Sequence, residues 1–153
     1  MLQRAGQTEA AVDRARAYLE ALPLRVEAPG RVADMPDDEV QRLLLRLRGA
    51  MSRTGRRVLR IDERLRRVAD HPLLPELVGG GVSSADHMLR IKPRSAVVRS
   101  ADAAVDAVEA YAADYEAYVE RNAEAMPEGF GMHDPMPRVL LVPGLGAVTT
   151  GAT

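Results

Sequence analysis

The sequence contains no cysteine and no tryptophan. Without cysteine the chain can form neither disulfides nor thiolate metal sites, and it cannot use a cysteine nucleophile. This composition fits the cytoplasm, where disulfides are rare. The sequence also lacks any apolar run close to the ~20 residues that a membrane-spanning helix needs. We therefore expect a cytoplasmic protein with no membrane partner.

Aromatic residues and lysine are almost as scarce. The aromatic residues are four tyrosines and one phenylalanine, and Lys92 is the only lysine. Arginine replaces lysine elsewhere, which indicates a coding bias more than a choice for binding. The remaining composition is typical of a globular protein, since hydrophobic residues make up 46% and charged residues 28% of the 153 residues. This length suffices for one domain with its own core.

The net charge of -1 hides two runs of opposite sign. Nine arginines lie between Arg46 and Arg67, and nine acidic residues lie between Asp102 and Asp134. The basic run could bind anions or nucleic acid. Alternatively, it forms a solvated face that meets the acidic helix within the fold or across a dimer. No aromatic residue among the arginines can stack on bases. This favours the second interpretation, and we expect no nucleic-acid partner.

Apolar residues recur at helical spacing in several stretches. Residues 8–22 and 36–55 are predicted as the first two helices, the second with three acidic residues in its first turn. Either Ser83 or Ser84 can cap a short helix further on. A long helix is predicted over residues 101–125.

Three short runs of aliphatic residues indicate strands. They are Val58–Ile61, Ala96–Val98 and Val139–Val142. With the helices between them they give the order strand, helix, strand, helix, strand, which is typical of an α/β fold. We predict a helical segment over residues 1–55 and an α/β segment over residues 56–153. The expected arrangement is three-layer-like, with two helices preceding a small sheet of at least three strands, which we expect to be parallel.

The three histidines, His71, His87 and His133, do not pair at helical or strand spacing. The sequence therefore predicts no metal site, and it shows no catalytic set. His87 stands close to Arg90 and Lys92, and such a group could hold a phosphate or polarise a carbonyl. The alternative is a capped helix start with solvated charges.

A glycine loop with Gly144, Gly146 and Gly151 follows the last predicted strand. Backbone amides freed by glycine can cradle a phosphate. The dinucleotide fingerprint, however, needs a third glycine where Thr149 stands, and a helix after it. The other interpretation is a tight turn after a core strand.

Three tyrosines, Tyr111, Tyr115 and Tyr118, fall on one face of the predicted long helix. We interpret this stripe as packing in a core or an interface. None of the three is followed four residues later by lysine, so the Tyr-x-x-x-Lys pair of short-chain dehydrogenases is absent.

Three segments together resemble one enzyme family. Ser84–Pro93 resembles an (S/T)-P-D-H segment that ends in R-T-K, with Ala85 in place of the usual proline. Asp114–Asn122 is similar to Y-x-x-Y-(F/V)-x-R-(H/N), and Asp134–Gly146 to D-P-x-P-R-V-x-L-V-P-G-x-G. The family is that of bifunctional class II aldolase/short-chain dehydrogenases, of the rhamnulose-1-phosphate aldolase/lactaldehyde dehydrogenase type.

The resemblance implies that the chain is an internal fragment of an enzyme of rhamnose catabolism. The parent would cleave a ketose 1-phosphate to dihydroxyacetone phosphate and lactaldehyde, and then oxidise the aldehyde with NAD. Residues 56–153 would form the carboxyl part of the aldolase region, before the dehydrogenase domain. Zinc and NAD would bind elsewhere in the parent, so we expect no cofactor in this segment. The partner would be the rest of the parent, and the chain could also form a homo-oligomer.

In such an enzyme His87, Arg90 and Lys92 would be candidates for contacts to the substrate phosphate or at a domain interface. The alternative hypothesis is a stand-alone α/β binding module. It would use the arginine-rich surface from Arg46 to Arg67 to hold an anion or an acidic partner.

Overall fold

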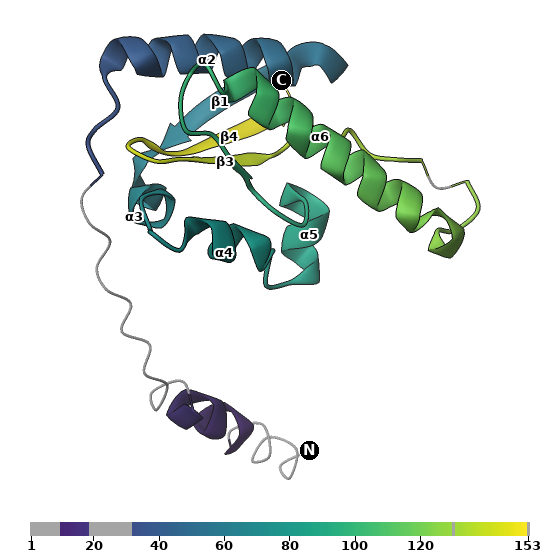
Figure 1. Cartoon of the computed structure of the whole chain (residues 1–153). Helices are drawn as coiled ribbons and strands as arrows, with labels where there is room; N and C mark the ends of the chain where they lie inside the picture. Colours follow the sequence, from purple (N-terminus) through teal and green to yellow (C-terminus); the bar gives the residue numbers. More distant parts are fainter. Residues whose placement is uncertain (1–9, 19–31, 130, 153) are drawn as a thin grey trace.

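The computed structural model describes residues 10–18, 32–129 and 131–152 (Figure 1). Residues 10–18 form a helix. The later helices are α2 (Asp37–Met51), α3 (Arg66–Ala69), α4 (Leu74–Gly79), α5 (Ala85–Ile91) and α6 (Ala104–Arg121). The strands are β1 (Arg57–Asp62), β2 (Ala96–Val97), β3 (Val139–Val142) and β4 (Gly146–Ala152). Both ends of the predicted helix over residues 8–22 lie outside the described residues.

The four strands form one sheet in the order β1-β4-β3-β2. The predicted α/β class is therefore confirmed, and so is the expectation of at least three strands. Parallel pairing is found only between β2 and β3, whereas β4 runs antiparallel to both β3 and β1. The expectation of a parallel sheet thus holds for one pair. The reason is that residues 146–152, which the sequence predicts as part of a loop, form β4. This strand follows β3 after a short turn, and a short turn can join only antiparallel strands.

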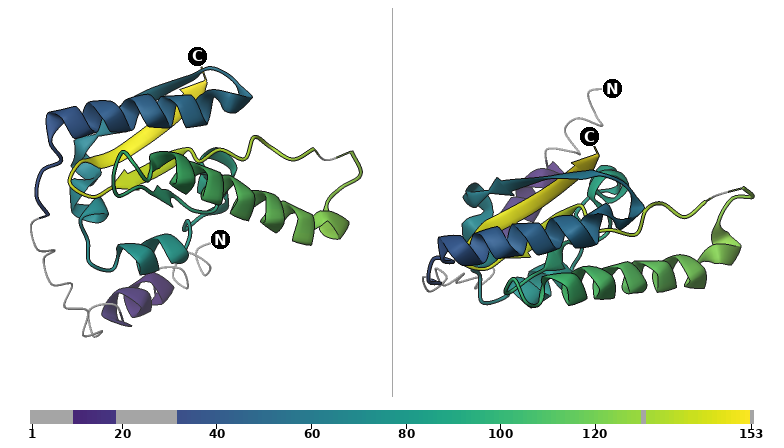
Figure 2. Two further views of the ribbon diagram at one scale, coloured as in Figure 1. Left: turned by 45° about the horizontal axis from the view of Figure 1, so that its top comes forward. Right: turned by 90° about the horizontal axis from the view of Figure 1, so that it is seen from above.

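Helices cover both faces of this sheet (Figure 2). The larger buried cluster joins α2 and α6 to one face and includes Leu47, Val108 and Leu140. The smaller cluster lies on the other face, where α3 and α4 pack against Leu141 and Ala147. Neighbouring residues of a strand point to opposite faces, so Leu140 and Leu141 serve different clusters. The three-layer-like arrangement is confirmed.

Helix α2 forms as the sequence predicts. Its apolar stripe buries Leu43, Leu47 and Met51 completely, and each such side chain contributes on the order of 1.5–3 kcal/mol of burial free energy. Glu39, in its first turn, accepts a hydrogen bond from the Ala101 amide at 2.7 Å. This bond ties the start of α2 to the segment that leads into α6.

Candidate functional site

Helix α5 carries His87 and Arg90 of the three residues that the sequence singled out, and Lys92 follows its last residue. At its start, Ser84 Oγ accepts a hydrogen bond from the His87 amide at 3.3 Å and lies 2.8 Å from His87 Nδ1. Asp86 and Arg90 form an exposed ion pair at 3.1 Å. The structure therefore places His87 in the cap of α5, as the capped-helix interpretation supposed.

Lys92 ends α5 in an unusual conformation. Its φ of 75° and ψ of 168° lie in a region that is essentially reserved for glycine. Pro93 follows and disfavours a helical Lys92, so the helix stops there. Among the described residues, Lys92 is the one non-glycine residue with positive φ and the one buried charged residue. These two features together set Lys92 apart from the rest of the described chain.

The Lys92 ammonium packs on an aromatic ring. Nζ lies 3.6 Å from the ring centroid of Tyr115 on α6. It finds no hydrogen-bond partner within the described part of the chain. Burial, joined by the nearby Arg138 charge, lowers the pKa of Lys92 to about 8, although Asp134 opposes the shift. Lys92 therefore remains mainly protonated at neutral pH but loses its proton at a lower pH than an exposed lysine does.

A cluster of half-buried charged side chains stands beside Lys92. Asp134 forms ion pairs with Arg138 Nη2, at 3.0 Å, and with Arg57 Nη2. It also accepts a hydrogen bond from the Met136 amide at 3.1 Å. Arg138 Nη1 and Arg57 Nε are buried and have no hydrogen-bond partner among the described residues. One carboxylate thus serves two arginines and leaves part of each guanidinium unsatisfied.

Lys92, Asp134 and Arg138 border a cavity of about 500 Å³ between α5, α6 and the loop before β3. We call it the Lys92 pocket. It is lined by Met88, Leu89, Arg90, Lys92, Pro93, Tyr115, Tyr118, Val119, Met126, His133, Asp134 and Arg138. Arg90 and Lys92 were expected from the sequence, and His87 does not belong to the lining.

Sequence reasoning missed His133, Asp134 and Arg138. The last two stand within the segment Asp134–Gly146, where their charges could have suggested a role. No pattern in the sequence marks His133. The structure brings all three to α5 because the loop after α6 folds back to enter β3 beside β2.

The tyrosine stripe of α6 faces the same region. The Tyr111 hydroxyl donates a hydrogen bond to the Arg94 carbonyl at 2.9 Å, and burial raises the pKa of Tyr111 to about 12. It therefore remains a neutral donor that holds the segment after α5. Tyr115 contacts Lys92, and Tyr118 lines the Lys92 pocket. The stripe thus packs against this segment and also forms part of the pocket wall.

The glycine loop lies in the turn between the two central strands, β3 and β4, and continues into β4. Gly144 has φ 82°, and its amide donates to an Asp70 carboxylate oxygen at 2.7 Å. A Cβ at Gly144 would lie 2.7 Å from the Ala33 carbonyl oxygen, and one at Gly146 would lie 2.6 Å from that of Asp62. The backbone therefore approaches both glycines closely, and the Gly144 amide already has an acceptor in Asp70. Gly151 lies within β4.

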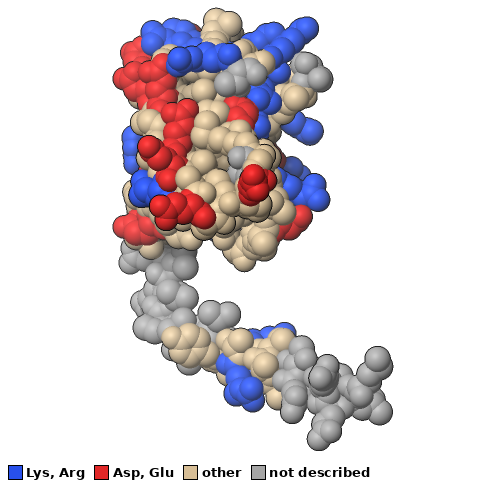
Figure 3. Space-filling model, turned by 90° about the vertical axis from the view of Figure 1, so that its right-hand side faces the viewer, with Lys and Arg blue, Asp and Glu red and all other residues tan. Residues whose placement is uncertain are grey.

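The arginine-rich stretch meets acidic residues from the second charged run. Arg46 pairs with Asp102 at 3.1 Å, and Arg53 pairs with Glu109 at 2.8 Å. Basic side chains gather at the top of Figure 3, where α2 lies, and acidic ones lie below and beside them. These pairs fit the interpretation of an arginine face that meets the acidic helix within the fold.

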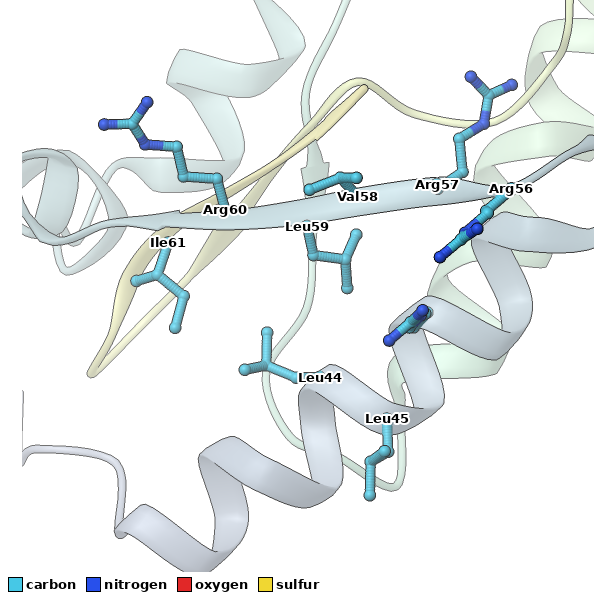
Figure 4. A pocket seen from close by; sticks show the side chains of 9 residues that line it. Leu44, Leu45, Arg56, Arg57, Val58, Leu59, Arg60 and Ile61 are labelled. Atoms are coloured by element: carbon cyan, nitrogen blue, oxygen red, sulfur yellow. The ribbon is translucent and has the colours of Figure 1, made fainter. Parts of the chain in front are cut away.

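A groove of about 570 Å³ runs between α2 and β1. In Figure 4, Leu44, Leu59 and Ile61 point into the space between the two elements, while Arg57 and Arg60 point away from α2. The groove is therefore mainly apolar at its base.

The described residues contain no group of three or more histidine or acidic side chains that could hold a metal ion. Within the same residues, no helix is long and apolar enough to cross a membrane.

Residues 38–153 match the family described as the second domain of class II aldolases, and the chain belongs to that family. The chain is also 28% identical over 137 residues to YuxG of Bacillus subtilis (strain 168), which is named an uncharacterized oxidoreductase. This similarity covers 79% of the chain but only 19% of YuxG, so the chain spans a small part of its relative. No solved structure matches the chain.

Proposed function

We propose that this chain is a segment of a bifunctional sugar-phosphate enzyme. The parent cleaves a ketose 1-phosphate to dihydroxyacetone phosphate and lactaldehyde, and it then oxidises the aldehyde with NAD. The observation that carries the proposal is a pair of similarities in one chain. Residues 38–153 match a class II aldolase domain, and the chain is similar to part of a far longer protein that is named an oxidoreductase. One polypeptide of that length has room for both activities.

In this proposal both catalytic sets belong to other parts of the parent. Class II aldolase chemistry uses a Lewis-acid metal to stabilise an enediolate, and the described residues offer no ligand set for one. Dehydrogenase chemistry needs a dinucleotide cradle, whereas the Gly144 amide is already bonded to Asp70. The segment would thus contribute structure and contacts while zinc and NAD bind in the remainder of the parent.

The alternative of a stand-alone module with an arginine-rich binding surface has less support. Arg46, Arg53 and Arg57 are already bound by carboxylates of the same chain. An anionic partner would have to displace these pairs before it could use the surface.

The proposal is tested by comparing this chain with the complete reading frame that encodes it. We expect the long protein to cleave rhamnulose 1-phosphate and to reduce NAD with lactaldehyde. The 153-residue chain should do neither, and it should contain far less than one zinc per molecule when purified without a histidine tag. Turnover by the short chain that survives repurification would overturn the proposal, as would a long protein with neither activity.

A further inference from the structure

We infer that the Lys92 pocket is a binding site for a small organic oxyanion, whose phosphate or carboxylate head group is held by Lys92 and Arg138. The inference rests on the pocket itself and does not depend on the proposed function of the parent.

The first argument is the set of hydrogen-bond donors without acceptors. A lysine ammonium has three N–H groups, and those of Lys92 are buried with no acceptor among the described residues. Arg138 Nη1 is in the same situation. The Tyr115 ring attracts the ammonium but accepts no conventional hydrogen bond. Because buried polar groups are nearly always satisfied in native proteins, these donors indicate a missing acceptor.

The second argument is the charge balance. Among the residues that line the pocket, Arg90, Lys92 and Arg138 are cationic and Asp134 alone is acidic. Arg90 is paired with Asp86, so the uncompensated charge lies at Lys92 and Arg138. Asp134 is already bonded to Arg57 and Arg138. Water could supply acceptors, but it could not compensate this excess of positive charge. An oxyanion supplies both the acceptors and the negative charge. Charge-assisted hydrogen bonds to phosphate and carboxylate are also stronger than hydrogen bonds between neutral groups.

The third argument is the shape and the remaining lining. A cavity of about 500 Å³ is far larger than a bare phosphate needs. The rest of the wall is mostly apolar, with Met88, Leu89, Val119 and Met126 beside two tyrosine rings. Such a wall fits an organic body attached to the anionic head group.

The fourth argument is the backbone of Lys92. A glycine would adopt φ 75° and ψ 168° with no steric cost, yet the only lysine of the chain stands there. Strained backbone of this kind clusters at ligand-binding and catalytic sites. A position that bears both strain and a buried charge is difficult to explain by stability.

The test is a binding titration of the full 153-residue chain with three small probes. Phenyl phosphate and benzoate carry the two head groups on one ring, and benzyl alcohol is their neutral counterpart. We expect one anion per chain to bind, with benzyl alcohol at least about tenfold weaker. The more tightly bound anion identifies the head group. Equal binding of the neutral probe, or no binding of either anion, would overturn the inference.

Variants then locate the site. Lys92→Met should weaken binding of the preferred anion by roughly tenfold or more, because it removes a charge-assisted donor. Arg67→Met is the matched control, because Arg67 is an exposed cation on α3 outside the lining of the pocket. Unchanged affinity in the Lys92 variant, or an equal loss in both variants, would refute the assignment.

A spectroscopic test needs no variant. Because the chain has a single lysine, a sample labelled at the lysine side chain gives one ammonium signal, that of Lys92. The preferred anion should shift this signal and raise the pKa of Lys92, since a bound negative charge stabilises the ammonium. A signal that stays constant at saturating probe would exclude Lys92 from the site.

Discussion

Two groups of cations in this molecule have opposite surroundings. Arg46 and Arg53 lie on the α2 side and are exposed, and each pairs with a carboxylate from the acidic run. Lys92 and Arg138 lie in the Lys92 pocket, and each buries donor atoms that have no partner among the described residues. The sequence shows many arginines in the first group and few cations in the second. The comparison shows that a high density of arginines along the sequence does not indicate a binding site. Buried cationic groups without a nearby acceptor are the better indication.

Asp134 provides the sharpest test, because it joins Arg57 to Arg138 and so supports the pocket. The side chains of Arg57 and Asp134 are only 10% and 17% exposed. Asp134→Asn should lower the free energy of unfolding by about 2–4 kcal/mol, since it leaves two poorly solvated guanidinium groups without their counter-charge. Chemical denaturation measures this change.

The matched control is Asp86→Asn, which removes a carboxylate from the exposed pair with Arg90. It should change the free energy of unfolding by less than about 0.5 kcal/mol. Similar effects of the two substitutions would break the comparison, because burial would then not distinguish the two kinds of ion pair.

Much of the fold could be predicted from the sequence because it depends on local patterns. The apolar spacing of α2, the Ser84 cap and the run Val139–Val142 each act within a few residues. β4 could not be found in this way. Its sequence is rich in glycine and threonine, and its strand state depends on pairing with β1 across many intervening residues.

The pocket could be predicted only in part, for a similar reason. Arg90 and Lys92 were grouped with His87 because they are close in sequence. His87 lies in the first turn of α5 and joins the Ser84 cap, whereas Lys92 follows the last residue of the helix and lines the pocket. The burial of Lys92 depends on Tyr115 and on the segment around Arg138. No local pattern could reveal these distant contacts.

Lys92→Met should have the opposite effect to Asp134→Asn. Methionine keeps an apolar chain of similar length and removes the poorly compensated buried charge, at the cost of the contact with Tyr115. We expect the free energy of unfolding to increase by about 1–2 kcal/mol near neutral pH. A stabilised variant that binds anions poorly would mark Lys92 as retained for binding.

The pH dependence of this gain follows from the depressed pKa of Lys92. The folded pKa is about 8 and the ordinary value is 10.5. Between these values the unfolded chain binds more protons, so the stability of the wild-type chain rises with pH. The advantage of Lys92→Met should therefore be full below the folded pKa and fade as pH rises through this window. A gain that is independent of pH would contradict the charge explanation.

The smallest expected effect concerns the pair of Arg53 and Glu109. Its side chains are 62% and 53% exposed, although the atoms approach to 2.8 Å. Water screens such a pair, and ordering two long side chains costs entropy. A double-mutant cycle with Arg53→Met and Glu109→Gln should give a coupling of about 0.2–1 kcal/mol, and this coupling should shrink in high salt. A coupling well above this range that persists in high salt would mean that exposed pairs contribute as much as the pairs of Asp134 with Arg57 and Arg138. The contrast between the two groups of cations would then no longer hold.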